Sequence, residues 1–335
     1  MKRLTIIGAG SWGTALAIIA GHAGHYVRLW SHNADVTAEI NAQHLNSRYL
    51  ASLAIPPNVA ATCDMPEALR ETELVVLASP SHVTRELCQR MMPFVQPQTL
   101  FVSATKGIET ETGKRISQVL RETFGERFEP RFVCLSGPSF AHEVAAGQPT
   151  AIVAASLNEE DSRCVQSALS FRNLRIYTNT DVIGTELGGS VKNVMAVAAG
   201  IVAGLGLGTN SIAALVTRGL AEIARFALAQ GARLETMTGL AGMGDLVLTC
   251  TGNLSRNRRV GYELGRGRAL ADILGEMHEV AEGVKTTHAV KKLAAQTSVE
   301  MPITNEVYAV LYEGKTAREA AHALMARPLR EEFYG

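Results

Sequence analysis

Short apolar runs alternate with longer stretches of helical spacing through the first 180 residues of the chain. Several runs are apolar at every position, as in Leu74–Ala78, which is typical of strands in a parallel sheet covered on both faces. The stretches between them, such as Thr14–His22 and Lys114–Thr123, predict helices. This alternation predicts an α/β, doubly wound, mostly parallel domain of the Rossmann type over residues 1–180. The predicted strands are Leu4–Ile7, Tyr26–Trp30, Leu74–Ala78, Thr99–Ser103, Phe132–Ser136, Ala151–Ala155 and Arg175–Tyr177.

The pattern changes after about residue 180, where no further strand is predicted. Apolar side chains recur at helical spacing within Ile212–Phe226. Pro302 can begin a later helix, and the segment Thr316–Glu319 has the spacing of a capping box. We therefore expect an all-helical domain over residues 181–335.

One uncharged stretch, Asn193–Thr217, raises the question of a membrane-spanning helix, which needs about 20 mostly apolar residues. Several glycines interrupt the stretch, and the polar segment Thr209–Ser211 lies within it. We therefore expect a buried helix, a glycine-rich turn and a second helix, with no insertion into a membrane.

Composition narrows the class of protein further. The chain has 335 residues, 47% of them hydrophobic, which is enough for two buried cores. Lys plus Arg equals Asp plus Glu at 32 each, so the basic excess typical of nucleic-acid binding is absent. The five cysteines are widely spaced and form no Cys-x-x-Cys pair, so neither a disulfide framework nor a metal site is expected. The N-terminus lacks the pattern of a signal peptide, which predicts a reduced, cytoplasmic protein.

A dinucleotide-binding motif lies at the start of the chain. Gly8-Ala9-Gly10-Ser11-Trp12-Gly13 follows the first predicted strand directly and opens a helix. In that context Gly8 permits a tight turn, Gly10 lets the backbone approach a pyrophosphate, and Gly13 lets the helix pack close to the strand. The free N–H groups of the helix N-terminus favour an anion. The motif predicts a site for NAD(H) or NADP(H).

The end of the second predicted strand bears on the choice of cofactor. NAD-selective sites usually place Asp or Glu there, but this chain has Ser31, His32 and Asn33. Ser31 and His32 can contact a 2′-phosphate, with Arg28 as a further candidate, which favours NADP(H) or tolerance of both cofactors. The alternative is that Ser31 and His32 are only turn residues.

Further segments carry candidate substrate chemistry. Ala104-Thr105-Lys106-Gly107 and Ser136-Gly137-Pro138-Ser139-Phe140 each follow a predicted strand, where open α/β sheets bind ligands. Lys192 lies at the edge of the long uncharged stretch, where desolvation would lower its pKa and suit it to proton transfer. An equal alternative is an interfacial lysine whose ammonium group reaches water. Ser255-Arg256-Asn257-Arg258-Arg259 can hold a phosphate, although a solvated basic helix start would have the same composition.

Together these segments resemble the bacterial-type NAD(P)-dependent glycerol-3-phosphate dehydrogenases over nearly the whole chain. Two more motifs, Gly242-Met243-Gly244-Asp245-Leu246 and Glu282-Gly283, contribute to the resemblance. The resemblance implies interconversion of sn-glycerol 3-phosphate and dihydroxyacetone phosphate by hydride transfer at carbon 2, supply of glycerol 3-phosphate for phospholipid synthesis, and a homodimer.

The resemblance also implies roles for individual residues, with substrate binding and catalysis centred on the helical domain. Lys192 would be the catalytic proton donor or acceptor, and Arg256 and Lys106 would contact both cofactor and substrate. Trp12 stands where many members carry another aromatic residue, which leaves the assignment unchanged. The implied substrate residues are Lys106, Gly137, Ser139, Lys192, Asp245, Ser255, Arg256 and Asn257, and the implied cofactor residues beyond the glycines are Ser11, Trp12, His32, Lys106, Ala141, Arg256, Val280 and Glu282.

Two other functions remain open at this stage. A different two-domain hydroxyacid dehydrogenase would share the dinucleotide domain and a catalytic lysine, but it would not need the Ser255–Arg259 cluster. A non-catalytic NAD(P)-binding module would leave Lys192 and Asp245 without a role.

Overall fold

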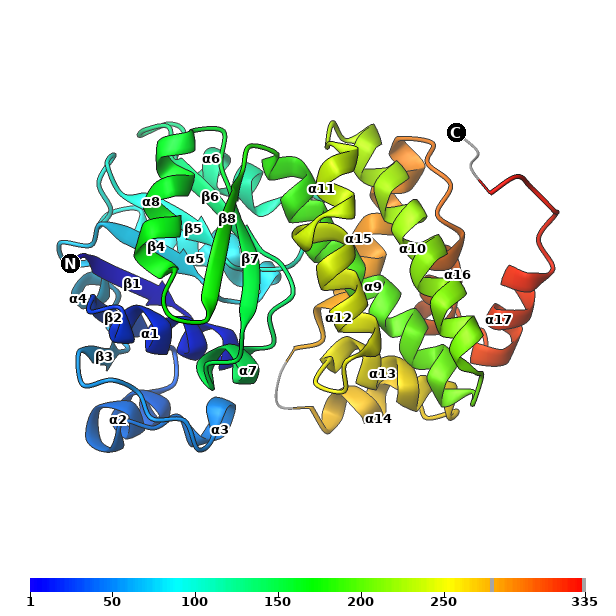
Figure 1. The fold of residues 1–335 in the computed structure, drawn as a ribbon, viewed down its shortest axis with the longest axis horizontal. Coiled ribbons are helices and arrows are strands. Elements are labelled where there is room, and N and C mark those ends of the chain that lie inside the picture. The colour runs from blue at the N-terminus through cyan, green and yellow to red at the C-terminus, as the bar shows by residue number, and fades with distance from the viewer. Residues whose placement is uncertain (278–279, 333–335) are drawn as a thin grey trace.

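The computed structural model describes residues 1–277 and 280–332, which form a sheet-containing half and a helical half side by side (Figure 1). One eight-stranded sheet has the order β3-β2-β1-β4-β5-β6-β7-β8, and only β6 and β7 pair antiparallel. The predicted doubly wound, mostly parallel sheet is therefore confirmed. The strands are β1 (Arg3–Ile7), β2 (Tyr26–Trp30), β3 (Val59–Thr62), β4 (Leu74–Leu77), β5 (Leu100–Ser103), β6 (Arg131–Ser136), β7 (Thr150–Ala155) and β8 (Leu174–Asn179).

All seven predicted strands are present, with ends within two residues of the prediction. The strand that the sequence pattern missed is β3, which lies at the edge of the sheet. Its sequence, Val-Ala-Ala-Thr, is short and has two alanines in the middle. Such a segment has little intrinsic strand preference, so its conformation depends on pairing with β2.

Helices cover both faces of the sheet, because successive strand residues point to opposite sides. In β4, Leu74 and Val76 pack with one core, whereas Val75 and Leu77 pack with the other. The first core includes side chains of α1 (Ser11–His22), α2 (Ala34–Gln43) and α8 (Glu159–Leu169). The second includes α4 (Met65–Leu69), α5 (Thr84–Met91) and α6 (Ile116–Phe124). This half also has three short helical elements, α3 (Ser47–Leu50), η1 (Ser81–Val83) and α7 (Ala141–Ala145).

The helical half surrounds α9 (Val182–Gly204), which connects directly to the last strand. By length and composition α9 could cross a membrane, but 83% of its most apolar window is buried inside the protein. The predicted buried helix, glycine-rich turn and second helix are confirmed, since α10 (Thr209–Ala229) begins after the turn. The other helical elements are α11 (Leu234–Thr238), η2 (Leu240–Gly244), α12 (Asp245–Thr251), α13 (Arg256–Gly265), α14 (Leu270–Gly275), α15 (Glu282–Gln296), α16 (Pro302–Tyr312) and α17 (Ala317–Met325).

Details of the helical half follow the sequence pattern. The helix predicted to begin at Pro302 is α16, and the capping box predicted within Thr316–Glu319 caps α17. In the part of this half that the structure describes, no strand follows β8. Close packing of α13 on α9 depends on glycine, because a Cβ added at Gly200 would lie 2.1 Å from the carbonyl oxygen of Arg258. This contact brings the first turn of α13 next to the C-terminal part of α9.

Candidate active site between the two halves

A cleft of about 1050 Å³ runs between the two halves and brings almost all of the predicted site residues together. Two glycines, Gly13 and Gly137, are not on its surface and lie behind its wall. The predicted site residues that line the cleft are Gly8, Gly10, Ser11, Trp12, His32, Lys106, Ser139, Ala141, Lys192, Asp245, Ser255, Arg256, Asn257, Val280 and Glu282.

The glycine-rich turn between β1 and α1 has the shape that its motif predicts. Gly8 has a φ of +115°, which favours glycine. A Cβ on Gly13 would lie 1.8 Å from the carbonyl oxygen of Gly8, so only glycine allows the helix to start this close. A Cβ on Gly10, in contrast, would have no described atom within 4 Å, because this residue faces the open cleft. Since α1 begins without a side-chain cap, a dinucleotide pyrophosphate fits at the positive end of its helix dipole.

A second segment supports this turn from outside. The Asn46 side chain is buried and donates to the carbonyl oxygen of Ala9 at 2.9 Å and to Thr14 Oγ1 at 2.8 Å. Ser11 Oγ donates to the carbonyl oxygen of Tyr49 at 2.9 Å. These bonds hold α3 against the glycine-rich turn, so Tyr49 also lines the cleft. Sequence reasoning did not predict this segment.

The cleft continues past the end of β2, where the cofactor preference would be decided. Ser31 and His32 line it, but Ser31 Oγ accepts from the backbone N–H of Asn33 at 3.1 Å, as a turn residue would. Arg28, suggested as a helper, points elsewhere: its guanidinium donates to the carbonyl oxygen of Arg70 and is not on the cleft surface. Arg48 on α3 and Arg90 on α5 do line the cleft, and the Arg90 guanidinium lies over the ring of Trp30, the last residue of β2.

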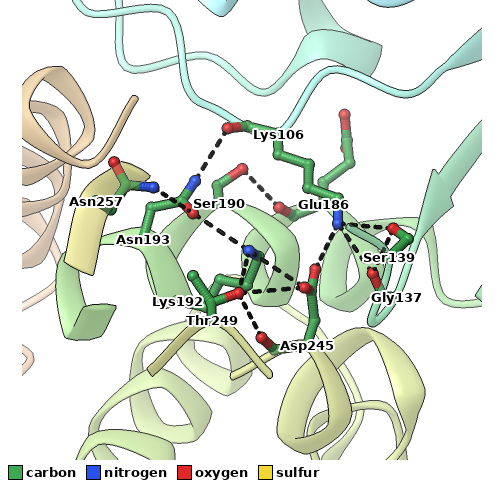
Figure 2. Close-up of polar contacts among 10 residues, drawn as sticks. All are labelled: Lys106, Gly137, Ser139, Glu186, Ser190, Lys192, Asn193, Asp245, Thr249 and Asn257. Carbon is green, nitrogen blue, oxygen red and sulfur yellow. Dashed lines mark hydrogen bonds and ion pairs between the residues drawn. The ribbon is translucent and has the colours of Figure 1, made fainter. Parts of the chain in front are cut away.

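Lys192 lies in the middle of α9 and faces a polar cluster in the wall of the helical half (Figure 2). Its Nζ donates to Thr249 Oγ1 at 2.7 Å and to Asn193 Oδ1 at 3.2 Å, and it lies 3.2 Å from Asp245 Oδ1. The other oxygen of Asp245 accepts from Lys106 Nζ at 2.7 Å. One buried carboxylate therefore bridges two ammonium groups, one from each half of the protein.

Burial changes the chemistry of this lysine. Lys192 is only 5% exposed, and desolvation of its charged form lowers its pKa to about 8. The Asp245 carboxylate acts in the opposite direction and favours the charged form, while Lys106 adds to the lowering. The predicted lowered pKa is therefore confirmed in direction, and the alternative of an ammonium group that reaches bulk water is wrong. A lysine with a pKa near 8 can both donate and accept a proton near neutral pH.

Lys106 is held where the sheet-containing half meets the helical half. Its Nζ donates to the carbonyl oxygen of Gly137 at 2.9 Å and lies 3.5 Å from Ser139 Oγ. Gly137 has a φ of +136°, and a Cβ there would lie 2.9 Å from the Cα of Ile152. Gly137 thus contributes its carbonyl group to the site through Lys106 and does not itself line the cleft.

The Ser255–Asn257 cluster forms the N-terminus of α13. Ser255 Oγ accepts from the N–H of Arg258 at 3.2 Å and so caps the helix. The Asn257 side chain is engaged within the protein, because its Nδ2 donates to Asn193 Oδ1 at 3.0 Å and its Oδ1 accepts from the N–H of Gly283 at 2.9 Å. The N-terminus of α13 carries the partial positive charge of a helix dipole, which suits it to an anion.

Sequence reasoning did not single out two residues that contact Lys192. Thr249 follows Asp245 by four positions on α12, so both face α9, and this spacing was an available signal. Its hydroxyl accepts from Lys192 and donates to the carbonyl oxygen of Asp245 at 2.6 Å. Asn193 was quoted only within a motif, although its amide links Lys192 to Asn257. The π-helical turn η2 that precedes Asp245 had no recognisable signal in the sequence.

Metal-binding side chains do not gather in this region. Within residues 1–277 and 280–332, no three His, Cys, Asp or Glu side chains are placed to hold a metal ion together. His25, three residues after the end of α1, bonds through its ring to the backbone of Lys2 and Ala168. It lies away from the cleft.

Comparison with known proteins agrees with this arrangement. Residues 3–162 match the family model described as NAD-dependent glycerol-3-phosphate dehydrogenase N-terminus, and residues 181–322 match its C-terminus. Glycerol-3-phosphate dehydrogenase [NAD(P)+] of Koribacter versatilis is 53% identical over 100% of both chains, and that of Geobacter sulfurreducens is 50% identical over 99% of both.

A solved structure extends the similarity to three dimensions. The crystal structure of glycerol-3-phosphate dehydrogenase from Coxiella burnetii superposes with a TM-score of 0.93 at 40% sequence identity. The match covers 97% of this chain and 99% of that one. The chain therefore belongs to the family of NAD(P)-dependent glycerol-3-phosphate dehydrogenases, which confirms the resemblance found in its sequence.

Proposed function

We propose that this protein interconverts sn-glycerol 3-phosphate and dihydroxyacetone phosphate with NAD(P) as the hydride carrier. The observation that carries this proposal is the position of Lys192. A desolvated lysine, held by Asp245 and Thr249, lies in one cleft with a dinucleotide-type turn and with the N-terminus of α13. Such a site combines a proton donor, a place for a hydride carrier and a place for a small phosphate.

The dinucleotide would lie along the cleft from the glycine-rich turn to the polar cluster. Gly8, Gly10 and the first N–H groups of α1 would hold its pyrophosphate, while Gly13 keeps the helix close. When bound, the dinucleotide would supply or accept the hydride at carbon 2 of the substrate. The remaining proposed cofactor contacts are Ser11, Trp12, His32, Lys106, Ala141, Arg256, Val280 and Glu282, all of which line the cleft.

Lys192 would exchange the proton at the carbon-2 oxygen. In reduction its ammonium group donates a proton to that oxygen, and in oxidation the neutral amine accepts it. Asp245 keeps the lysine oriented and, through its second oxygen, orients Lys106 as well. The positive charge of Lys106 would stabilise the substrate oxygen as it gains negative charge.

The phosphate of the substrate would bind at the N-terminus of α13. Arg256 would provide a charged donor, and the helix N-terminus would add its partial positive charge. The side chains of Ser255 and Asn257 are used to shape this turn. Gly137 and Ser139 would complete the substrate site by holding Lys106 from the sheet-containing half.

We also propose the biological setting and organisation that the family suggests. Residues 1–180 would be the cofactor domain and residues 181–335 the substrate-binding and catalytic domain. The protein would be a cytoplasmic homodimer that supplies glycerol 3-phosphate for phospholipid synthesis. Support for a reducing compartment comes from the five cysteines, none of which forms a disulfide.

A spectrophotometric assay tests the proposed reaction. The purified protein should oxidise NADPH or NADH when dihydroxyacetone phosphate is added, and it should ignore unphosphorylated dihydroxyacetone. Equal rates with the two ketones would contradict the phosphate site. Cofactor binding without turnover of either ketone would instead favour a non-catalytic binding module.

A further inference from the structure

Ser81 and Glu282 form a hydrogen-bonded pair that connects the two halves of the protein at the wall of the cleft. The Glu282 carboxylate, at the first residue of α15, accepts from the backbone N–H of Ser81 at 3.0 Å and from Ser81 Oγ at 2.6 Å. Ser81 begins η1, which leads into α5, so the carboxylate caps the N-terminus of a helical run in the other half. These partners are separated by 201 residues in the sequence.

The two residues differ in their access to the cleft. Glu282 lines it, whereas Ser81 is only 1% exposed and lies behind Glu282. An ionised carboxylate has about four acceptor positions, and Ser81 occupies two of them. The other two remain for N–H or O–H donors in the cleft. Ser81 is thus placed to fix the direction in which this carboxylate presents its free lone pairs.

The backbone next to Lys106 packs against this pair. A Cβ added at Gly107 would lie 2.5 Å from Ser81 Oγ and 2.7 Å from Glu282 Oε2. The absence of a side chain at Gly107 therefore leaves room for the pair, and the pair in turn supports the loop that carries Lys106. This places the carboxylate at the end of the cleft where the polar cluster lies.

Hydrogen bonds also lead from Glu282 toward Lys192. The next residue, Gly283, donates its N–H to Asn257 Oδ1, and Asn257 donates to Asn193 Oδ1, which accepts from Lys192. The position of the α15 N-terminus is therefore tied both to the sheet-containing half and to the catalytic lysine.

We propose that Ser81 is a positioning residue, which orients the Glu282 carboxylate toward N–H and O–H donors on the nicotinamide side of the bound dinucleotide. This inference rests on the proposed function, because it requires that a nicotinamide dinucleotide occupies the cleft. Ser81 acts only through Glu282 and does not contact the dinucleotide itself.

A double-mutant cycle on NADPH binding tests this role without substrate or turnover. NADPH fluorescence gives the dissociation constant for the parent, Ser81→Ala, Glu282→Ala and the double variant. Ser81→Ala should raise the Kd about tenfold in the parent background, because one hydrogen bond to a charged acceptor is lost. In the Glu282→Ala background the same change should alter the Kd by less than about twofold.

Matched variants separate positioning from folding. Ser81→Thr keeps the hydroxyl and should bind NADPH within about threefold of the parent. Ser103→Ala removes an equally buried hydroxyl that bonds to no other atom of the described chain, and it should leave the Kd unchanged. Turnover of Ser81→Ala at saturating NADPH should stay within about threefold of the parent, since Lys192 keeps its bonds to Asp245 and Thr249.

The outcomes distinguish this inference from the proposed function. A parent protein that binds neither NADPH nor NADH would refute the proposed function. A parent that binds, but in which Ser81→Ala has the same effect on the Kd in both backgrounds or no effect, overturns only the role of Ser81. If Ser81→Ala melts far below the parent, hydrogen exchange at the Ser81 amide of the parent and of Glu282→Ala tests the contact between the two residues instead. Exchange should be at least about tenfold faster in Glu282→Ala than in the parent, and equal rates overturn the proposal.

Discussion

The two walls of the cleft are built on different principles. The wall of the sheet-containing half presents backbone, because Gly8, Gly10 and Gly13 leave the start of α1 uncovered by side chains. The wall of the helical half presents buried charge, because Lys192 and Asp245 face each other with almost no exposure. In the proposed function the first wall would bind by shape and by helix N–H groups, and the second would act through the protonation state of a single side chain.

This difference determines how each wall can fail. A side chain added to the backbone wall should lower stability where it points into the protein, and it should weaken cofactor binding where it points into the cleft. Removal of one charged group from the wall of the helical half should slow the chemical step, while the remaining ion pairs preserve the fold.

The largest effect is expected from Lys192→Met, which removes the proton and the charge but keeps a similar length. Turnover should fall by at least about 10²-fold, the usual loss for a missing general acid. The fold should survive, since Asp245 keeps its ion pair with Lys106 at 2.7 Å. Steady-state kinetics, the NADPH dissociation constant and the melting temperature are compared with the parent.

Lys291→Met is the matched control for this prediction. Lys291 contacts Glu313 and the Tyr308 ring on the helical half and does not line the cleft. Its turnover should equal that of the parent. Near-normal turnover in Lys192→Met would refute the catalytic role, and a strongly lowered melting temperature would point to a structural one.

The second prediction contrasts two glycines in one turn. Gly13→Ala places a methyl group 1.8 Å from the carbonyl oxygen of Gly8, so the protein should lose about 1–3 kcal/mol of stability. Gly10→Ala places its methyl group in open space at a φ of −70°, so stability should be unchanged or slightly higher. Because that space belongs to the cleft, Gly10→Ala should instead weaken NADPH binding about tenfold, equivalent to about 1.4 kcal/mol.

Melting temperatures and NADPH titrations of the two variants check this contrast. Equal thermal destabilisation by both substitutions would show that the turn is a packing element throughout. Unchanged NADPH affinity in Gly10→Ala would show that the pyrophosphate does not bind at this turn.

The contrast between the walls also explains what the sequence could predict. The turn is contained within Gly8–Gly13 and directly follows a strand, so adjacent residues were enough to predict its conformation. Its contacts with Asn46 and Tyr49 were not predicted, because these residues are more than 30 positions away. The strand β3 was missed because its alanine-rich segment acquires strand geometry only by pairing with β2. Lys192 was recognisable as a single charge at the edge of an apolar stretch, but the same pattern fits a lysine that reaches water.

The partners of Lys192 required the tertiary structure or the family. Lys106 and Asp245 are separated by 139 residues, and no local pattern predicts that they share a contact. Likewise, Ser31, His32 and Arg28 are close in sequence, yet strand geometry and a bond to Arg70 direct the Arg28 guanidinium away from the cleft. Residue types and spacing therefore predicted which segments matter, whereas packing decided which side chains meet.

The third prediction is a pH profile with opposite signs in the two directions. Because the pKa of Lys192 is lowered to about 8, the ammonium form that donates a proton disappears as pH rises through 8. Dihydroxyacetone phosphate reduction should therefore fall above pH 8, by up to about tenfold per pH unit, while glycerol 3-phosphate oxidation should rise from pH 7 to about pH 8 and then level off. Rates measured at saturating substrates between pH 7 and 10 check this, and parallel profiles in the two directions would contradict a single acid–base group.

The smallest effect concerns cofactor choice at the end of the cleft beyond β2. With no acidic side chain on that strand end and with Arg48 and Arg90 on the cleft surface, NADPH should bind at least as well as NADH. His32→Asp should lower the NADPH-to-NADH affinity ratio several-fold, because a carboxylate accepts from a ribose 2′-hydroxyl and repels a 2′-phosphate. Arg48→Ala and Arg90→Ala should lower the same ratio by weakening the binding of NADPH but not of NADH.

Arg28→Ala is the control for these variants. Its guanidinium lies outside the cleft, so the substitution should leave the ratio unchanged. Titrations with 2′,5′-ADP and 5′-AMP separate the phosphate contribution from the rest of the cofactor. If His32→Asp and both arginine variants keep the parent ratio, the residues at this end shape only the turn and the cofactor preference is set elsewhere.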